Sequence, residues 1–301
     1  MQNKKKRRLS DQLCYWLMIL PAIVLTFMFT TRTWPGLLIA FEDFIPTLGW
    51  WKSEWIGLYN FKVFFMQPDA WRIVRNSLVI AVGKIVFGVP LYITFALMLN
   101  EVRNLKLKKF IQTASYLTHF ISWVIYGTIL KSLIGPTGMI NTMLDAAGKD
   151  KIPFLGTPWL FPILMIVTDC LKEFGYCSIL YLSGMTGIDP GLYEAAEMDG
   201  ANRFQLAIHV TLPGIRYIIA INLILSLGSI LSAGFDQIFN MSNDLVRSTG
   251  DIIDTWVYRQ GIVGLNYGVA SAVSLLNSVI AMCLIATAYW AAGKFANYKI
   301  F

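Results

Sequence analysis

Four polar side chains recur at helical spacing inside an otherwise apolar stretch. In "TDCLKEFGYCSILYLSGM", Asp169, Lys172, Glu173 and Tyr176 stand at i, i+3, i+4 and i+7, so a helix places all four on one face. Carboxylates accept hydrogen bonds or protons, an ammonium donates them, and a phenol does both. Such a face can bind a polar ligand, relay a proton, or form an internal network in which Lys172 pairs with Asp169.

A helix carrying this face would enter lipid poorly by itself. One charge at the centre of a membrane helix costs about 2.5–3.5 kcal/mol, so three cost roughly 8–10 kcal/mol. The eleven Leu, Ile, Phe and Val residues of 159–185 return only about 3–7 kcal/mol, at 0.3–0.6 kcal/mol each. The polar face therefore needs water, another subunit or a polar ligand beside it.

Two later apolar stretches carry milder polar faces. Asn222, Ser226 and Ser229 follow one another at helical spacing, Asp236 stands further on, and Asn277 belongs to a patch in the last stretch. Small polar side chains of this kind also form helix-packing contacts, and the two interpretations remain open. We expect a polar translocation path with these candidate residues: Asp169, Lys172, Glu173, Tyr176, Asn222, Ser226, Ser229, Asp236 and Asn277.

The composition places these polar faces in a membrane protein. Of 301 residues, 56% are hydrophobic and 14% are charged, against about 25% charged residues in a typical soluble domain. The net charge is +7, but the basic residues gather at the ends of apolar stretches instead of alternating with aromatic ones on a polar surface. That distribution follows the positive-inside rule and argues against nucleic-acid binding.

Six stretches are apolar enough to cross a bilayer, which takes roughly 20 residues per helix. They lie at about 13–33, 76–99, 110–134, 159–185, 214–235 and 267–292. We therefore expect an all-α polytopic membrane protein with a single transmembrane domain over 13–301, preceded by a basic segment at 1–12. A loop at 186–213 joins the fourth and fifth spans.

Basic residues near the span ends indicate the orientation. They precede the first span at 4–8, separate the second from the third at 103–109, and follow the sixth at Lys294 and Lys299. With six alternating spans all three groups fall on one side of the membrane. We expect both termini, and the loop between the fourth and fifth spans, in the cytoplasm.

The loop between the fourth and fifth spans encodes two short helices separated by a glycine. In "DPGLYEAAEMDGANRFQ", Asp189 can cap a helix that starts at Pro190, and Gly200 suits the left-handed position that ends it. Asn202 with Gln205 three residues later has the pattern of a capping box. The first helix is acidic, whereas helices that lie on lipid are rich in Lys and Arg. A protein partner is therefore favoured.

Recognisable enzymatic motifs are missing from the chain. It contains neither H-E-x-x-H nor G-x-S-x-G, and His119 and His209 have no partner at metal-ligand spacing. No G-x-x-x-x-G-K-[ST] occurs, so ATP and its magnesium, if used, would be bound by another polypeptide. We expect no catalytic residue, no metal site and no cofactor in this chain.

The same loop resembles a known family signature. Its spacing is similar to the EAA motif of ABC importer permeases, "EAA-x3-G-x9-I-x-LP", with Glu194-Ala195-Ala196, then Gly200, then "VTLP" at 210–213. Valine replaces the usual isoleucine. Further stretches, among them "WRIVRNSLVIAVGKIVFGVPLYITFALMLNE" and "FDQIFNMSNDLVRSTGDIIDTWVYRQGI", resemble maltose-type carbohydrate permeases, especially the branch for oligosaccharides and polysaccharide fragments.

The resemblance implies a type I importer permease fold and a role as one transmembrane subunit of an ATP-driven oligosaccharide importer in a bacterial plasma membrane. It also implies a second permease subunit, two ATPase subunits and an extracellular or periplasmic solute-binding protein. The loop would then hold a coupling helix that docks on the ATPase through Glu194, Ala195, Ala196, Asp199 and Gly200.

One rival interpretation comes from a different class of transporter. A stand-alone secondary transporter could use Asp169, Lys172 and Glu173 as an ion or proton relay. The acidic docking loop and the absence of detectable inverted repeats in the sequence count against it.

Overall fold

The fold is built almost entirely from helices. The computed structural model describes residues 2–49, 51–228 and 230–295. Within these ranges the extended structure is one antiparallel pair, β1 (Glu42–Asp43) with β2 (Glu54–Trp55). Apart from this short pair, the expectation of an all-α protein is confirmed.

The chain divides into two compact units, 1–67 with 257–275 and 68–256 with 276–301, which are described one at a time. The elements of the first are α1 (Gln2–Phe29), η1 (Thr31–Phe41), the strand pair, α2 (Tyr59–Met66), η4 (Arg259–Val263) and the beginning of α15 (Tyr267–Phe295). Asn60 holds its connections together, because its amide donates to the carbonyls of Ala40 and Glu42 at 3.1 and 3.0 Å.

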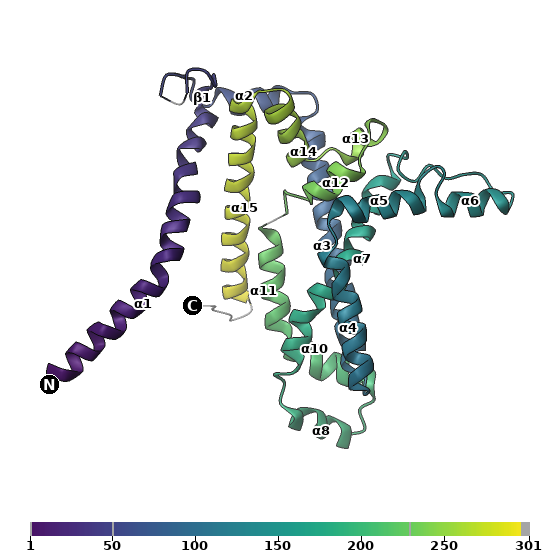
Figure 1. Ribbon diagram of the computed structural model, residues 1–301. Coiled ribbons are helices and arrows are strands. Elements are labelled where there is room, and N and C mark those ends of the chain that lie inside the picture. The colour runs from purple at the N-terminus through teal and green to yellow at the C-terminus, as the bar shows by residue number, and fades with distance from the viewer. Residues whose placement is uncertain (1, 50, 229, 296–301) are drawn as a thin grey trace. The chain divides into compact units, whose positions relative to one another are not determined.

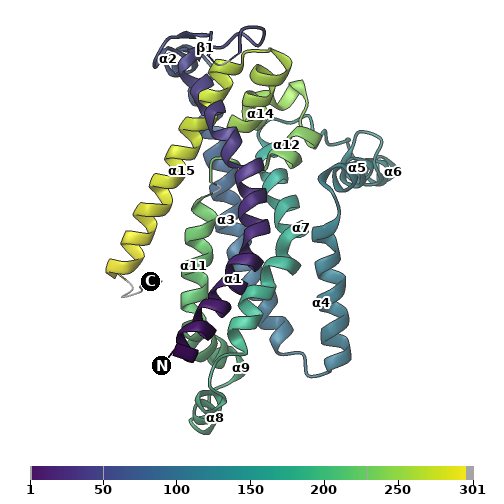
Figure 2. The same ribbon diagram turned by 60° about the vertical axis from the view of Figure 1, so that its left-hand side comes forward.

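The second unit is organised around two long helices. α3 (Ala70–Asn100) and α7 (Leu160–Met185) lie side by side, and α4 (Leu105–Phe120) packs on α7 (Figure 1, Figure 2). The shorter elements are α5 (Trp123–Ile134), α6 (Met139–Ala146), α8 (Pro190–Met198), α9 (Arg203–Leu206), η2 (Ala207–Thr211), α10 (Leu212–Gly214), α11 (Arg216–Leu227), α12 (Phe235–Met241), η3 (Asp244–Val246), α13 (Arg247–Gly250) and α14 (Ile253–Tyr258).

Close packing holds α7 between α3 and α4. A buried core cluster joins α3, α7 and the residue before α11; its members are Tyr92, Ala96, Leu99, Tyr181, Leu182, Met185 and Ile215. On the side of α4, a Cβ added to Gly175 would collide with the carbonyl of Ser115. Glycine is therefore required at this crossing, as small residues commonly are between membrane helices.

Long apolar helices account for part of the expected six spans. Three segments are long and apolar enough to cross a membrane, namely 14–41, α3 and most of α15, and two bent helix pairs raise the number to at most five. α7 coincides with the expected fourth span but carries Asp169, Lys172 and Glu173, more charge than an ordinary apolar span. The count of six stays a prediction for the described part of the chain.

The basic segment expected at 1–12 is continuous with the first span. α1 begins at Gln2 and runs through to Phe29 without interruption.

The expected third span at 110–134 is interrupted. α4 ends at Phe120, α5 begins at Trp123, and the helical segments on either side of the break are bent by 100°. Ser122 causes the restart, because its hydroxyl accepts a hydrogen bond from the amide of Ile125 at 3.3 Å and caps α5.

The expected fifth span at 214–235 is helical over only part of its length. α11 ends at Leu227, and Ala233 and Gly234 then adopt left-handed conformations, with φ of 48° and 90°. Glycines and serines in this segment are weaker helix formers than the leucines before them. The result is an irregular connection that leads from α11 into α12.

Candidate functional site

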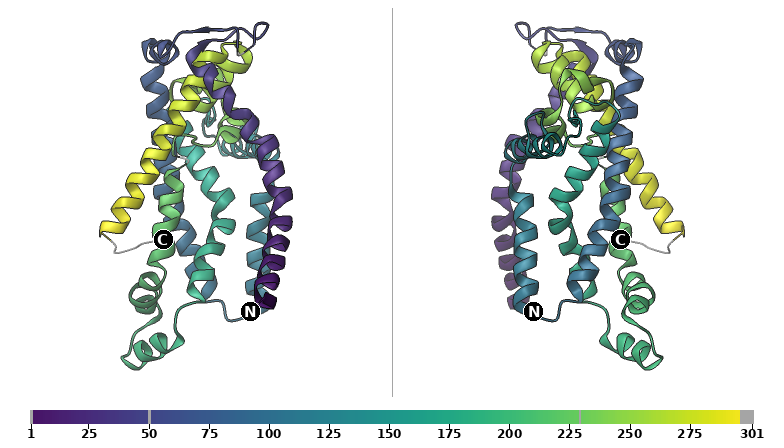
Figure 3. Two further views of the ribbon diagram at one scale, coloured as in Figure 1. Left: turned by 90° about the vertical axis from the view of Figure 1, so that its left-hand side faces the viewer. Right: turned by 90° about the vertical axis from the view of Figure 1, so that its right-hand side faces the viewer.

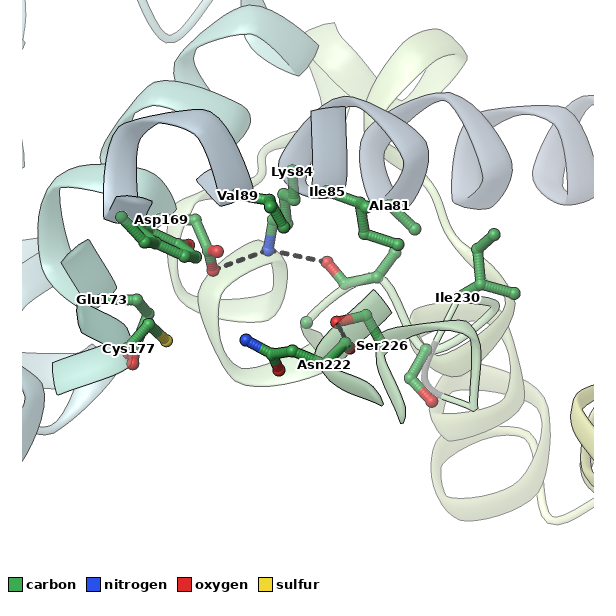
Figure 4. A pocket seen from close by; sticks show the side chains of 14 residues that line it. Ala81, Lys84, Ile85, Val89, Asp169, Glu173, Cys177, Asn222, Ser226 and Ile230 are labelled. Atoms are coloured by element: carbon green, nitrogen blue, oxygen red, sulfur yellow. Dashed lines mark hydrogen bonds and ion pairs between the residues drawn. The ribbon is translucent and has the colours of Figure 1, made fainter. Parts of the chain in front are cut away.

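Lys84 of α3 is the centre of a polar cluster in the second unit (Figure 4). Its ammonium donates to Asp169 Oδ1 at 2.8 Å and to Gln237 Oε1 at 2.6 Å. It also donates to the carbonyl oxygen of Ala233 at 2.9 Å. These acceptors use all three ammonium protons, and only 12% of the Lys84 side chain is exposed. Lys84 thereby joins α3, α7 and the irregular connection after α11.

Gln237 of α12 completes this cluster. While its side-chain oxygen accepts from Lys84, its nitrogen donates to the carbonyl of Met165 and to Thr168 Oγ1, both at 2.8 Å. The residue is fully buried, so an unsatisfied amide here would be costly. These bonds anchor the beginning of α12 on α7.

A cavity of about 380 Å³ opens beside the cluster (Figure 4). Aliphatic side chains such as Val89 and Ile230 form part of its wall. Its polar lining consists of Lys84, Tyr92, Asp169, Glu173, Asn222, Ser226 and Ser232. Apolar walls with a few convergent polar groups are typical of small-molecule sites.

Four of the predicted path residues line this cavity. Asp169 and Glu173 reach it from α7, and Asn222 and Ser226 reach it from α11. Asn222 donates to the hydroxyl of Tyr181 at 2.7 Å, which orients its amide. The helical spacing predicted that each pair shares a face of its own helix, and the structure brings the two faces to one cavity.

A second cluster lies where α4 ends. Lys172 donates to the carbonyl of His119 at 2.7 Å and to Glu173 Oε1 at 3.2 Å, and its ammonium lies 5.2 Å from the ring centroid of Trp123. The Nδ1 atom of His119 is 2.6 Å from Glu173 Oε2. Tyr176 stacks on the His119 ring, with centroids 3.9 Å apart, and does not line the cavity.

The pairing of Lys172 with Asp169, one of the arrangements considered from the sequence, is wrong. Asp169 pairs with Lys84 of a different helix, and Lys172 pairs with its neighbour Glu173. The free carbonyls at the end of α4 explain the choice, because a helix C-terminus attracts a cation.

Three other predicted residues lie elsewhere. Asp236 is exposed on α12 and is absent from the cavity lining. Asn277 of α15 has a buried Oδ1 atom without a hydrogen-bond partner in the described part of the chain. Ser229 lies outside the described residues. A role for these three in a path stays a prediction.

Sequence reasoning missed Lys84, Tyr92 and Gln237. Lys84 had a detectable signal, since it is the single charged residue between Arg75 and Glu101, and an ionisable residue in a membrane helix marks a polar contact. Tyr92 and Gln237 had no such signal, because only the packing of the helices brings Tyr92 to the cavity and Gln237 to Lys84.

The loop after α7 folds as its sequence predicts. Asp189 caps α8, accepting a hydrogen bond from the amide of Gly191 at 3.0 Å. Gly200 ends the helix region with φ of 82°. Asn202 and Gln205 form the predicted capping box through hydrogen bonds of 2.9 and 2.7 Å. All three expectations are confirmed.

The side chains of α8 have few contacts within the chain. Leu192 and Met198 are 55% and 89% exposed, although both are apolar. Of the predicted docking residues, Ala196 is half-buried, and the exposed ones are Glu194, Ala195, Asp199 and Gly200. Figure 3 shows from two opposite sides that this loop extends beyond the ends of α3 and α7. Apolar groups exposed beside acidic ones are typical of a protein contact surface.

Two side-chain contacts fix the position of this loop, one within the loop and one with the end of α3. The hydroxyls of Tyr193 in α8 and Thr211 in η2 are 3.0 Å apart. Arg203, the first residue of α9, donates to Glu101 Oε2 at the end of α3 at 2.6 Å. η2 is a π-helical turn, a distortion that often occurs at functional sites.

Comparisons with known proteins agree with this architecture. Residues 85–293 match the family described as "Binding-protein-dependent transport system inner membrane component". The chain is 41% identical to Protein LplB of Bacillus subtilis, over 95% of this chain and 90% of the relative. It is 36% identical to the polygalacturonan/rhamnogalacturonan transport system permease protein YteP of the same organism, over 100% and 95%.

Solved structures extend the similarity to the whole fold. A chain in the crystal structure of a bacterial ABC transporter involved in the import of the acidic polysaccharide alginate matches with a TM-score of 0.87 and 33% identity, covering 97% of this chain and 99% of that one. A second structure of an alginate ABC transporter, in complex with alginate pentasaccharide-bound periplasmic protein, matches with a TM-score of 0.87 and 34% identity over 98% and 99%. The chain thus belongs to the family of inner-membrane components of binding-protein-dependent transport systems, and it is an ABC transporter permease, a transport subunit rather than an enzyme.

Proposed function

We propose that this chain is one transmembrane subunit of an ATP-driven importer of oligosaccharides or polysaccharide fragments. The observation that carries the proposal is the cavity on α3, α7 and α11, with its polar lining, in a permease whose relatives are named for saccharide transport. Carboxylates accept hydrogen bonds from sugar hydroxyls, and amide and hydroxyl side chains exchange them in both directions. Asn222, Ser226, Asp169 and Glu173 therefore suit a hydroxyl-rich ligand.

The proposed path requires a second permease subunit. A charged and polar face inside a membrane is stable when it meets a cavity or another subunit. We infer that a second permease, identical or different, supplies the opposite wall and that a solute-binding protein delivers the sugar to the outer opening.

The proposed coupling element is α8. The exposed residues Glu194 and Ala195, half-buried Ala196, and exposed Asp199 and Gly200 just after the helix form a small acidic surface. We infer that this surface docks on an ATPase subunit, which binds ATP and magnesium. Closure of the two ATPase subunits would move α8 and, through its contact with η2 and the contact of α9 with the end of α3, alternate the access of the cavity.

This assignment also proposes an orientation. The loop that contacts an ATPase must lie in the cytoplasm, so an alternating chain with six spans has both termini there, in a bacterial plasma membrane. The competing secondary transporter fits the geometry less well, because Asp169 is held by Lys84 and Glu173 by Lys172 and His119, instead of forming an unobstructed relay along α7.

Affinity purification of the tagged chain from its native host, followed by transport in proteoliposomes, tests the proposal. We expect an ATPase and a second permease to co-purify, and oligosaccharide uptake to require ATP and the binding protein. Gly200→Val should reduce uptake more than tenfold while leaving membrane insertion intact, because φ of 82° strains a β-branched residue. Gly36→Val is the matched control, since nothing lies within 4 Å of its added Cβ. Uptake without any ATPase, or normal uptake by Gly200→Val, would refute the assignment.

A further inference from the structure

We propose that the cavity beside Lys84 selects an uncharged stretch of saccharide and disfavours uronic acids. The inference rests on the proposed function and concerns the substrate class of the same site. It starts from the charges of the second unit, which are already matched with one another around the cavity.

Both lysines near the cavity are engaged. Lys84 donates to Asp169 Oδ1, Gln237 Oε1 and the carbonyl of Ala233 at 2.8, 2.6 and 2.9 Å, so a ligand carboxylate would have to displace one of these acceptors. Lys172 is 3% exposed, contacts Glu173 and a backbone carbonyl, and does not line the cavity.

The carboxylates, by contrast, are presented to the cavity. Asp169 and Glu173 both belong to its lining, and Lys84 is the single basic residue among the described lining residues. A uronate would therefore face two carboxylates, each already paired with a lysine, and a lining cation whose protons are all used, so no positive charge is left to balance its own. Like charges placed together discriminate against a ligand even where its shape fits.

An uncharged sugar meets no such obstacle. Its hydroxyls can donate to the remaining acceptor positions of Asp169 and Glu173, since each carboxylate has about four lone-pair sites. Ser226 gives its proton to the carbonyl of Asn222 at 2.8 Å, so towards a ligand its hydroxyl is an acceptor and not a donor. The lining therefore offers acceptors to a hydroxyl-rich ligand.

This expectation differs from what the comparisons alone would suggest. YteP is named for polygalacturonan and rhamnogalacturonan, and the solved neighbours are described with the acidic polysaccharide alginate. Similarity to them covers the fold, whereas the charge balance at Lys84, Asp169 and Glu173 is read from this chain itself.

The test measures uptake by the whole reconstituted importer with chemically matched sugar pairs. Suitable pairs are short oligogalacturonates with their methyl esters, and xylo-oligosaccharides with and without a glucuronic acid branch. Asp169→Asn releases one positive charge at Lys84 and should lower the uncharged-to-acidic uptake ratio about tenfold, as a charge-assisted hydrogen bond to a uronate becomes possible. Lys84→Met combined with Asp169→Asn should restore the original ratio.

Two further variants keep the result interpretable. Asp145→Asn makes the same chemical change on exposed α6 and should leave the ratio unaltered. Glu173→Gln should shift the uncharged-to-acidic uptake ratio in the same direction as Asp169→Asn. It replaces Asp169→Asn as the test variant if that protein does not fold. Because the binding protein and the second permease are the same throughout, their selectivity cancels when the uptake ratio of each variant is compared with that of the unmodified importer. An unchanged ratio in both variants overturns the inference; failure of every sugar to enter overturns the proposed function as well.

Discussion

The hydrogen bond between Tyr193 and Thr211 is expected to hold α8 at a fixed angle to the distorted turn η2. The two hydroxyl oxygens are 3.0 Å apart, Thr211 is buried, and Tyr193 is half-buried. Thr211 also donates to the carbonyl of Leu206 at 3.3 Å within the π-helical turn. Movement of α8 would therefore be transmitted to η2 and α11 through this pair.

Tyr193→Phe removes this bond and leaves the ring in place. A neutral hydrogen bond contributes about 0.5–1.5 kcal/mol to stability, which corresponds to about a 2- to 12-fold change in the equilibrium between docked and undocked α8. We expect amide hydrogen exchange in Pro190–Met198 to accelerate by about fivefold. Uptake per ATP hydrolysed by the reconstituted importer should fall by a similar factor, because part of the α8 movement no longer reaches η2.

A double-mutant cycle separates this bond from unrelated effects. Thr211→Val alone should produce a loss at least as large, because it also removes the bond to Leu206. The double variant should then be no worse than Thr211→Val, since the shared bond is already absent. Tyr217→Phe in α11 is a matched control, because the same substitution there removes the hydroxyl that accepts from Arg216 at 2.9 Å. Additive effects of the two changes, or unchanged exchange in Tyr193→Phe, would refute this reasoning.

Two further predictions concern stability. Burial raises the pKa of Asp254 in α14 to about 6. The folded state therefore retains a proton that the unfolded chain releases near pH 4. This proton stabilises the folded state at low pH, and its contribution is lost as the pH rises from about 4 through 6. Asp254→Asn should therefore raise the melting temperature of the purified complex at pH 7 but not at pH 4. The control Asp244→Asn, at an exposed position, should show no such difference. An equal shift by Asp254→Asn at both pH values would contradict the prediction. Gly175→Val should lower the free energy of unfolding by about 1–3 kcal/mol or more, as overpacking does, and with it the melting temperature, because the added side chain meets the backbone of Ser115. Gly36→Val, in open space, should leave it unchanged, and equal melting of the two variants would show that α4 and α7 adjust freely.

Local patterns in the sequence were sufficient to predict the loop after α7. Asp189, Gly200 and the pair Asn202 and Gln205 act on backbone groups within a few positions of themselves, and all were read correctly. The fourth helix was also anticipated, since α7 covers 160–185 against an expected 159–185. Its register placed Asp169 and Glu173 on one face without knowledge of any other helix.

The interruptions of the third and fifth spans were not anticipated. A single serine at 122 within an apolar stretch is compatible with a continuous helix. The capped alternative accompanies the packing of α4 on α7 and of α5 on α12, which the sequence does not reveal. Likewise, the left-handed backbone at Ala233 and Gly234 is held by the ammonium of Lys84, which donates to the carbonyl of Ala233. Hydropathy records the apolar length of such a segment but not the direction of its backbone.

The family, the apolar helices, the caps of the acidic loop and the residues that share a face within one helix could all be predicted from the amino-acid sequence. Which charges neutralise one another depended on the packing of separate helices. Lys84 and Asp169 are 85 residues apart in the sequence. Lys172 binds the carbonyl of His119 at the end of α4, although Asp169 is closer to it in the sequence. The physical reason is that helix caps depend on neighbours along the chain, whereas a buried charge pairs with whatever group the packing of separate helices brings within hydrogen-bonding distance.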